Sequence, residues 1–212
     1  MINKAAGERV IPGREGAAGE ASLRERLERE RGEKLWVVHR LDAGTSGTLV
    51  FARDADAHRL LSRAFEGREV EKTYLALVAG VPAFDEITVD LPLHEARRGK
   101  MRPATPGEPG AKPSRTVFRV IERFGAAGAA LVEARPHTGR HHQIRVHLKA
   151  LGHPLLVDPQ YGRREPLVLG GARLERTPLH AARLELPHPD GGRLVLEAPL
   201  PPDLDAVIGA LR

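Results

Sequence analysis

Three groups of residues in this 212-residue sequence carry side chains whose types and spacing could support chemistry. The first is the Gly-rich segment HRLDAGTSG, whose only acid, Asp42, could act as a nucleophile or a base. The second is the segment RPHTGRHHQIRVHLK (135–149), which holds four histidines and four cations. The third is Tyr74, within KTYLALVAG. A single Asp in a loop is most often a turn residue, and a Tyr in a strand is most often a half-buried aromatic, so no group by itself identifies an activity.

Metal binding is one alternative for the histidines. His137 and His141 are four residues apart, a spacing that a metal site could use. Thr138 and Gly139 interrupt any helix between them, and no acidic third ligand lies nearby. We therefore expect histidines that form hydrogen bonds or face solvent, and no metal site.

The charge distribution favours a polyanionic partner. Lys and Arg number 33 against 28 Asp and Glu, which gives a net charge of +5. Segment 135–149 and segment 97–102, RRGKMR, each contain four Lys or Arg and no acid. Because Lys and Arg gain affinity for phosphates by releasing counterions, these two basic segments indicate a surface for nucleic acid. We expect no carboxylate to neutralise them.

Composition excludes several classes of protein. Cysteine is absent, which excludes disulfides, Cys-ligated zinc, iron–sulfur clusters and thiol nucleophiles. Hydrophobic residues at 41% and charged residues at 29% are typical of a folded globular chain. No uncharged apolar run approaches the ~18 residues that a membrane span needs, and the N-terminus lacks the apolar core of a signal peptide. The sequence predicts a single domain over 1–212 in a soluble, cytoplasmic protein.

The elements around Asp42 and Tyr74 follow from hydrophobic patterning. Apolar runs at 34–39 and 48–52 predict two strands, so Asp42 lies in a loop between rigid elements, where reactive groups are often found. Segment 72–80 predicts a strand in which Tyr74 shares a face with Ala76 and Val78.

The other elements complete an α+β arrangement. Ser22 has capping-box spacing for a helix that ends near Gly32, and an amphipathic helix over 57–65, begun by Asp54 or Asp56, is expected to end at a left-handed Gly67. The opening residues are expected to be irregular. Further expected elements are an exposed, mobile loop at 91–113, a hairpin of 116–124 with 129–136, a helix over 142–152, a hairpin of 179–186 with 193–198 across HPDGG, and a C-terminal helix from 201–203. Antiparallel strand pairs with intervening helices indicate the α+β class with a mixed, mainly antiparallel sheet.

Taken together, the three groups resemble the signatures of the RluA-type pseudouridine synthases, which isomerise uridine in structured RNA. HRLDAGTSGTLVFAR is similar to the catalytic-loop motif of that family, and the nucleophilic Asp falls on Asp42. EKTYLALVAG is similar to the segment that supplies an active-site Tyr, here Tyr74. RPHTGRHHQIRVHLKALGHPLLVDPQYG resembles the third signature, whose basic residue falls on Arg145. The resemblance extends from about Asn3 to the C-terminus.

This resemblance implies that Asp42 is the catalytic residue. A carboxylate could attack the ribose or the ring and form a covalent intermediate, or it could remove the C2′ proton so that a glycal forms, and the sequence leaves these routes open. Asp42 must be ionised in each route. Arg145, always cationic and able to donate two parallel hydrogen bonds, is the expected partner. Loss of one member of such a buried pair would cost about 3–5 kcal/mol.

The resemblance assigns the remaining residues to substrate binding. Tyr74 would stack on the uracil, and its hydroxyl would help to remove the C5 proton. The target base must leave its stack, and Arg40 would fill or hold the vacated position. Arg140 and Lys149 would meet phosphates, so that the RNA is read by shape more than by base edges. No step requires a metal, a nucleotide or a redox cofactor, so we expect no cofactor.

Two features depart from the family pattern. Relatives have an edge strand before an Asn-Lys-Pro-x-Gly turn, whereas here Ala5 replaces the Pro and we expect the strand to be missing from a shortened N-terminus. We also expect the chain to lack the small RNA-binding domain that precedes the catalytic core in many relatives. Affinity would then come from the catalytic domain itself, including the basic segment 97–102.

The sequence therefore predicts an RNA pseudouridine synthase that acts as a monomer, away from membranes, on structured ribosomal or transfer RNA. A catalytically inactive RNA-binding relative of the same fold is one alternative. A histidine-ligated metal hydrolase, which a chelator would inactivate, is another.

Overall fold

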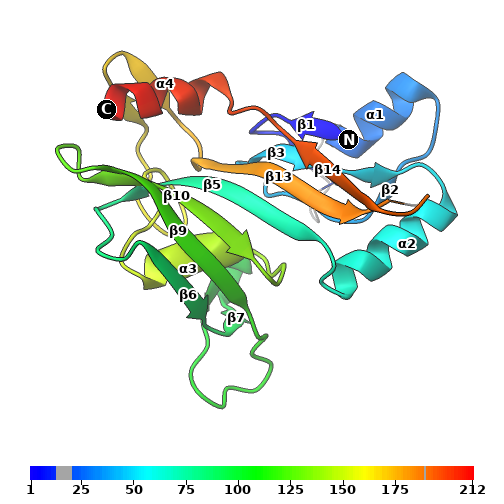
Figure 1. Cartoon of the computed structure of the whole chain (residues 1–212), viewed down its shortest axis with the longest axis horizontal. Coiled ribbons are helices and arrows are strands. Elements are labelled where there is room, and N and C mark those ends of the chain that lie inside the picture. The colour runs from blue at the N-terminus through cyan, green and yellow to red at the C-terminus, as the bar shows by residue number, and fades with distance from the viewer. Residues whose placement is uncertain (13–20, 189) are drawn as a thin grey trace. The chain divides into compact units, whose positions relative to one another are not determined.

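The computed structural model describes residues 1–12, 21–188 and 190–212 (Figure 1). Part of the opening predicted to be irregular (13–16), and Pro189 of the predicted HPDGG turn, lie outside the described residues. The chain divides into two compact units. The first unit comprises Met1–Glu71 and Ala181–Pro199, and the second comprises Lys72–His180 and Leu200–Arg212.

The sheet of the first unit is built around a short buried strand, β3 (Ser46–Leu49). β3 lies between β1 (Ile2–Lys4) and β13 (Leu179–Pro187), and β14 (Arg193–Glu197) pairs with β13 in the predicted hairpin. The expectation of a missing N-terminal strand is wrong, because β1 pairs antiparallel with β3 and places Asn3 opposite Thr48.

The strand predicted at 34–39 is shorter than expected, and the strand predicted at 48–52 is divided between the end of β3 and β4. The residues that pair with each other are those of β2 (Trp36–Val37) and β4 (Phe51–Ala52), which form a separate two-stranded sheet. Val50 separates β4 from β3, and its N–H donates to Nε2 of His39 over 3.1 Å. The His39 side chain therefore accepts from a backbone N–H that could have formed a strand-to-strand hydrogen bond in a continuous strand.

Both helices of the first unit begin as their capping residues predict. In α1 (Leu23–Arg31) the N–H of Ser22 donates to the Glu25 carboxylate at 2.9 Å, which closes the capping box. In α2 (Ala55–Glu66) the Asp54 carboxylate accepts from the N–H of Ala57 at 2.7 Å. The apolar face of α2 packs on β4, β13 and their neighbours. The expectation that Gly67 is left-handed is wrong. Its φ is −70° and its N–H continues the helical bonding, so the left-handed residue is Arg68, with φ 62°.

The second unit is built on four antiparallel strands in the order β5 (Glu71–Ala79), β10 (Ala129–Pro136), β9 (Arg115–Phe124) and β6 (Glu86–Asp90) (Figure 1). The predicted β9–β10 hairpin is confirmed, with a register irregularity between Leu131 and Val132. One face of these strands packs against α3 (Gln143–Ala150). The other face packs against α4 (Pro202–Leu211), β11 (Leu167–Leu169) and β12 (Ala172–Leu174). Ala76 and Val78 belong to the α3 side, with Tyr74 packed beside them, so the predicted strand face is confirmed.

Residues 104–113 are the mostly exposed loop that the Pro and Gly content of segment 91–113 predicts, but the first half of the segment is not. The first half forms a hairpin of β7 (Leu93–Glu95) and β8 (Met101–Pro103), joined by the 3-10 turn Arg97–Gly99. Leu93 and Met101 are buried against Val146 of α3 and Tyr161. The prediction failed for the first half because two apolar side chains in a polar segment are enough to anchor the hairpin.

The mainly antiparallel strands and the helices of the described residues place the chain in the α+β class, as predicted. In the described ranges, none of the helices is long and apolar enough to cross a membrane.

Candidate functional site

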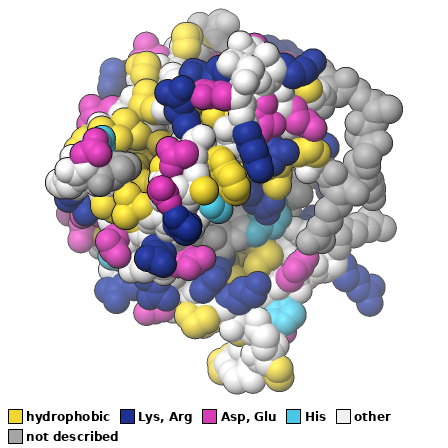
Figure 2. Space-filling model, turned by 90° about the vertical axis from the view of Figure 1, so that its right-hand side faces the viewer, with side chains coloured by type: hydrophobic (Ala, Val, Ile, Leu, Met, Phe, Trp, Pro, Cys, Tyr) yellow, Lys and Arg dark blue, Asp and Glu magenta, His cyan; other side chains and the backbone are white. Residues whose placement is uncertain are grey.

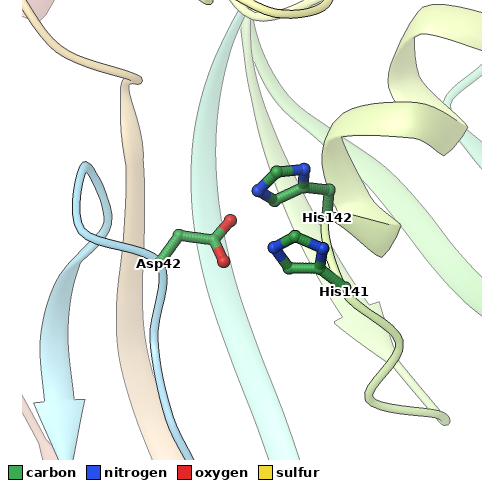
Figure 3. Close-up of side chains that lie close together, drawn as sticks. All are labelled: Asp42, His141 and His142. Carbon is green, nitrogen blue, oxygen red and sulfur yellow. The ribbon is translucent and has the colours of Figure 1, made fainter. Parts of the chain in front are cut away.

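Asp42 is a half-buried residue of the first unit, on the loop between β2 and β3 (Figure 3). Its carbonyl oxygen accepts from the N–H of Thr45 at 3.0 Å, so the backbone of residues 42–45 forms a closed turn. The next carbonyl, that of Ala43, accepts from the N–H of Gly7 at 2.8 Å. These bonds fix the backbone on which the Asp42 carboxylate is mounted.

Lys4, at the end of β1, adds a buried cation to the same loop. Its ammonium donates to the carbonyl oxygens of Ala5, Glu8 and Ala43 at 2.7, 2.9 and 3.1 Å. Three hydrogen bonds offset much of the cost of removing the ammonium from water. Lys4 therefore ties the N-terminal segment to the residue next to Asp42. Reasoning from sequence missed this role.

Gly47 sets how closely β3 approaches β13. Its φ is +113°, and a Cβ at this position would lie 2.3 Å from the carbonyl oxygen of Ala181. Only glycine combines this backbone conformation with this separation. The Asp42 loop therefore enters the sheet at a position that admits no side chain.

The two residues before Leu41 differ in exposure. Nε2 of His39 accepts the Val50 N–H, so a neutral His39 carries its proton on Nδ1, and its ring stacks on Phe65 with centroids 4.6 Å apart. Arg40 is exposed, and its role in holding the position of an extruded base stays a prediction.

Arg145 is buried in the second unit, on α3, and is paired with a carboxylate that the sequence analysis did not single out. Its Nε and Nη2 donate to the two carboxylate oxygens of Asp158 at 2.8 and 2.7 Å. Nη2 also lies 3.2 Å from Oε1 of Gln160. The Arg145 guanidinium carbon lies 4.9 Å from the centre of the Tyr161 ring.

Asp158 is almost completely buried, and its carboxylate has donors on several sides. The backbone N–H groups of Gln160 and Tyr161 donate to it at 3.0 and 3.2 Å. Burial by itself raises the pKa of Asp158, but the hydrogen bonds and charge of Arg145 and the two N–H groups outweigh burial, so the pKa is lowered. Asp158 is therefore ionised at neutral pH.

Tyr161 connects this pair to two other elements. Its hydroxyl oxygen accepts from the N–H of Met101 in β8 at 2.8 Å and lies 2.8 Å from Nδ1 of His142. His142 occupies the left-handed region, with φ 54°, at the start of α3. The rings of His141 and His142 have centroids 3.7 Å apart, and Figure 3 shows them side by side before the helix.

A buried polar network fixes the start of α3. Oε1 of Gln143 accepts from the Thr138 hydroxyl at 2.7 Å and from the Arg140 N–H at 3.0 Å. One turn later, His147 lies 3.0 Å from the hydroxyls of Ser114 and Thr116, and burial lowers its pKa. The turn that carries Arg140, His141 and His142 is therefore rigidly connected to β9.

Tyr74, Arg140 and His137 complete the predicted set. Tyr74 is half-buried on β5, opposite Ala134. Arg140 is half-buried, and its Nε donates to the Pro113 carbonyl at 3.2 Å. Within the part of the chain that the structure describes, His137 belongs to no group of three His, Asp or Glu close enough to share a metal ion.

The two basic segments are partly neutralised, which corrects the expectation that no carboxylate opposes them. Arg102 pairs with Glu108, whose pKa the hydrogen bonds of Arg102 lower to about 2. Arg135 pairs with Glu133 at 2.5 Å. Figure 2 likewise shows acidic side chains interspersed among the basic ones on the face in view. The side chain of Arg98 lies outside the described residues.

The structure brings Arg145 together with Asp158 and Tyr161, and of these three only Arg145 was predicted to be a site residue. A signal was available in the sequence. Residues 134–157 contain no acid, so Asp158 is the first carboxylate after the cationic segment. It also follows an apolar run that predicts burial, and a buried Asp requires a partner.

Comparisons with known proteins agree on one family. The family model described as RNA pseudouridylate synthase matches residues 1–150. The chain is 41% identical over 221 residues to ribosomal large subunit pseudouridine synthase D of Nitrosomonas europaea, a match that covers 100% of this chain and 62% of that protein. It is 41% identical over 192 residues to dual-specificity RNA pseudouridine synthase RluA of Salmonella typhi, covering 91% of this chain and 84% of that protein.

A solved structure gives the same result. Human RNA Pseudouridylate Synthase Domain Containing 4 matches with a TM-score of 0.77 and 30% identity, over 99% of this chain and 88% of that chain. Among the curated relatives, the chain spans 62% of the Nitrosomonas protein and 53% of an uncharacterized RNA pseudouridine synthase of Chloroflexus aurantiacus. It therefore corresponds to little more than half of some relatives.

Proposed function

Because this chain belongs to the RNA pseudouridylate synthase family and is of the RluA type, we propose that it converts uridine to pseudouridine in structured RNA. The observation that carries the proposal is the family match over residues 1–150, which includes Asp42, Tyr74 and Arg145. We further propose that the two units work as one catalytic domain, as a monomer in the cytoplasm. The substrate would be ribosomal or transfer RNA.

Asp42 is the proposed catalytic residue. In the reaction, the bond from C1′ to N1 breaks, the uracil turns without leaving, and a bond from C1′ to C5 forms, while C5 loses a proton and N1 gains one, so that the product is an isomer of the substrate. The Asp42 carboxylate would attack the ribose or the ring, or would remove the C2′ proton. The fixed backbone of its loop supports this assignment, because a reacting group must be held in place to gain from proximity.

Arg145 is the proposed partner of Asp42. A guanidinium close to the carboxylate would keep it ionised when RNA excludes water from the site. Support comes from the burial of Arg145 and from its fixed orientation on α3, two conditions under which a cation acts strongly on its neighbours. Tyr74, half-buried on β5, would stack on the target uracil, and its hydroxyl would assist loss of the C5 proton.

The remaining predicted residues would bind the RNA. Arg40 is exposed and would take the position of the extruded base. Arg140 and Lys149 would contact phosphates. In segment 97–102 Arg102 is neutralised by Glu108, so the remaining cations of the segment would contribute most of the affinity there.

Release of tritium from RNA labelled at C5 of uridine tests the function. We expect wild-type protein to release tritium from ribosomal or transfer RNA, and chelators to leave the rate unchanged. Asp42→Asn should abolish release while RNA binding stays within about twofold, since the change removes one charge and no volume. Asp54→Asn is the matched control, because Asn caps a helix about as well as Asp.

The outcomes separate the alternatives. Binding of RNA by the wild type without release would favour the inactive relative, and activity lost to a chelator would favour the metal hydrolase. Turnover by Asp42→Asn near that of the wild type would refute the assignment of Asp42.

A further inference from the structure

The Arg145 guanidinium is held by more contacts than a simple ion pair provides. Its two bonds to Asp158 are parallel and short, at 2.8 and 2.7 Å, and they define both the plane of the guanidinium and its rotation. The Tyr161 ring lies 4.9 Å from the guanidinium carbon, and Gln160 accepts from the Nη2 edge. All of these groups come from one loop, 158–161.

That loop is itself fixed. The Asp158 carboxylate accepts from two backbone N–H groups of its own loop, so it cannot turn without breaking them. The Tyr161 hydroxyl is held between the Met101 N–H and Nδ1 of His142. Two of the groups that orient Arg145, Asp158 and Tyr161, are therefore held by partners of their own.

Stability alone is a weak explanation for this arrangement. A buried ion pair contributes little net stability relative to apolar residues of the same volume, because both charges must be desolvated. What the pair provides is a fixed direction for a cation.

We propose that Asp158 and Tyr161 are positioning residues that act through Arg145, holding its guanidinium in the orientation that the isomerisation requires. The inference rests on the proposed function, in which Arg145 faces the catalytic carboxylate. It predicts that loss of Asp158 lowers kcat and leaves the affinity for RNA unchanged, because neither residue is assigned to RNA binding.

The test is a double-mutant cycle measured as tritium release. Asp158→Asn should lower kcat by about 10- to 100-fold, the range found when the hydrogen-bond partner that orients a metal ligand is removed. In an Arg145→Lys background, which already lacks the two parallel bonds, Asp158→Asn should lower kcat by less than about twofold further. A role of Asp158 that does not act through Arg145 would instead multiply the two losses.

The chain offers a matched control in a second bidentate pair. Arg176 donates to the two oxygens of Asp203 at 2.7 and 2.9 Å, at the start of α4. Asp203→Asn removes the same chemistry and should leave kcat unchanged. Equal loss of kcat in Asp158→Asn and Asp203→Asn, or multiplied losses in the cycle, would overturn the proposal.

A measurement that needs no turnover separates this inference from the proposed function. In ¹⁵N NMR spectra, the Nε–H signal of Arg145, assigned by its loss in Arg145→Lys, should be sharp and protected from exchange with solvent. It should broaden in Asp158→Asn and weaken in Tyr161→Phe, which loses the hydroxyl but keeps the ring. A wild type that releases no tritium would refute the function alone. A rapidly exchanging Arg145 signal in the wild type would refute the positioning role.

Discussion

Substitution of Gly47 by alanine tests whether the close approach of β3 to β13 is as tight as the structure indicates. The new Cβ would lie 2.3 Å from the carbonyl oxygen of Ala181, 2.7 Å from its nitrogen and 2.8 Å from its carbonyl carbon. All three are backbone atoms, so no side-chain rotation can relieve the overlap. The φ of +113° adds strain of its own, since residues with a Cβ rarely adopt it.

Two terms set the magnitude. A non-glycine residue in such a backbone region costs about 1–3 kcal/mol, and an overlap in a packed interior typically costs about 1–3 kcal/mol more. We therefore expect Gly47→Ala to reduce the free energy of unfolding by about 2–6 kcal/mol. For a chain of this length, each kcal/mol corresponds to about 2–4 °C in Tm, so the transition should fall by roughly 4 °C or more.

Thermal and urea unfolding followed by circular dichroism would measure the effect. Gly209→Ala is the control, because Gly209 lies exposed in α4 with open space around its Cα and no positive φ. That change should raise stability by about 0.5–1 kcal/mol, since alanine is the better helix former. A Gly47→Ala protein whose Tm stays within about 2 °C of the wild type would show that the strands can separate at little cost, and the reasoning would be wrong.

Two further predictions concern buried titratable groups. Burial lowers the pKa of His147, so below pH 6.5 the unfolded chain binds a proton that the folded chain does not, and the free energy of unfolding should fall as the pH drops. His147→Gln should flatten this pH dependence in urea midpoints measured between pH 7.5 and 5.5. An unchanged slope would contradict the assignment. Lys4→Met should leave the carbonyl of Ala43 with one donor fewer. It should lower the rate of tritium release at temperatures well below its Tm, where the variant is folded. A variant with wild-type turnover would contradict a role for Lys4 in fixing the Asp42 loop.

Elements whose signals lie within one segment of sequence could be predicted. The Ser22 capping box and the β9–β10 hairpin both formed where their residues indicated, because every group that each one needs is local. Elements that depend on distant contacts could not. The hairpin at 91–113 is held by Tyr161, whose hydroxyl accepts from Met101 60 residues earlier in the chain, and neither a propensity nor a period reports such a contact.

The candidate site divides in the same way. A cation such as Arg145 is visible in the sequence because its chemistry is independent of its neighbours. Its orientation is not visible, because the orientation depends on Asp158, 13 residues later, and on a loop without regular structure. The charge of the basic segment 97–102 was overestimated for the same reason. Arg102 is neutralised by Glu108, an acid that lies outside that segment.

Lys4 and Arg145 present the same physical problem in the two units. Each is a buried cation whose burial must be offset by acceptors, three carbonyl oxygens in one case and a carboxylate in the other. An apolar side chain could fill either volume without that cost. An ammonium and a guanidinium differ from apolar side chains in that they bind acceptors in a fixed geometry. Lys4 fixes the carbonyl of Ala43, next to the proposed catalytic residue Asp42, and Arg145 is itself the fixed group and the proposed partner of Asp42. Geometry at the site therefore accounts better than stability for why each charge is buried.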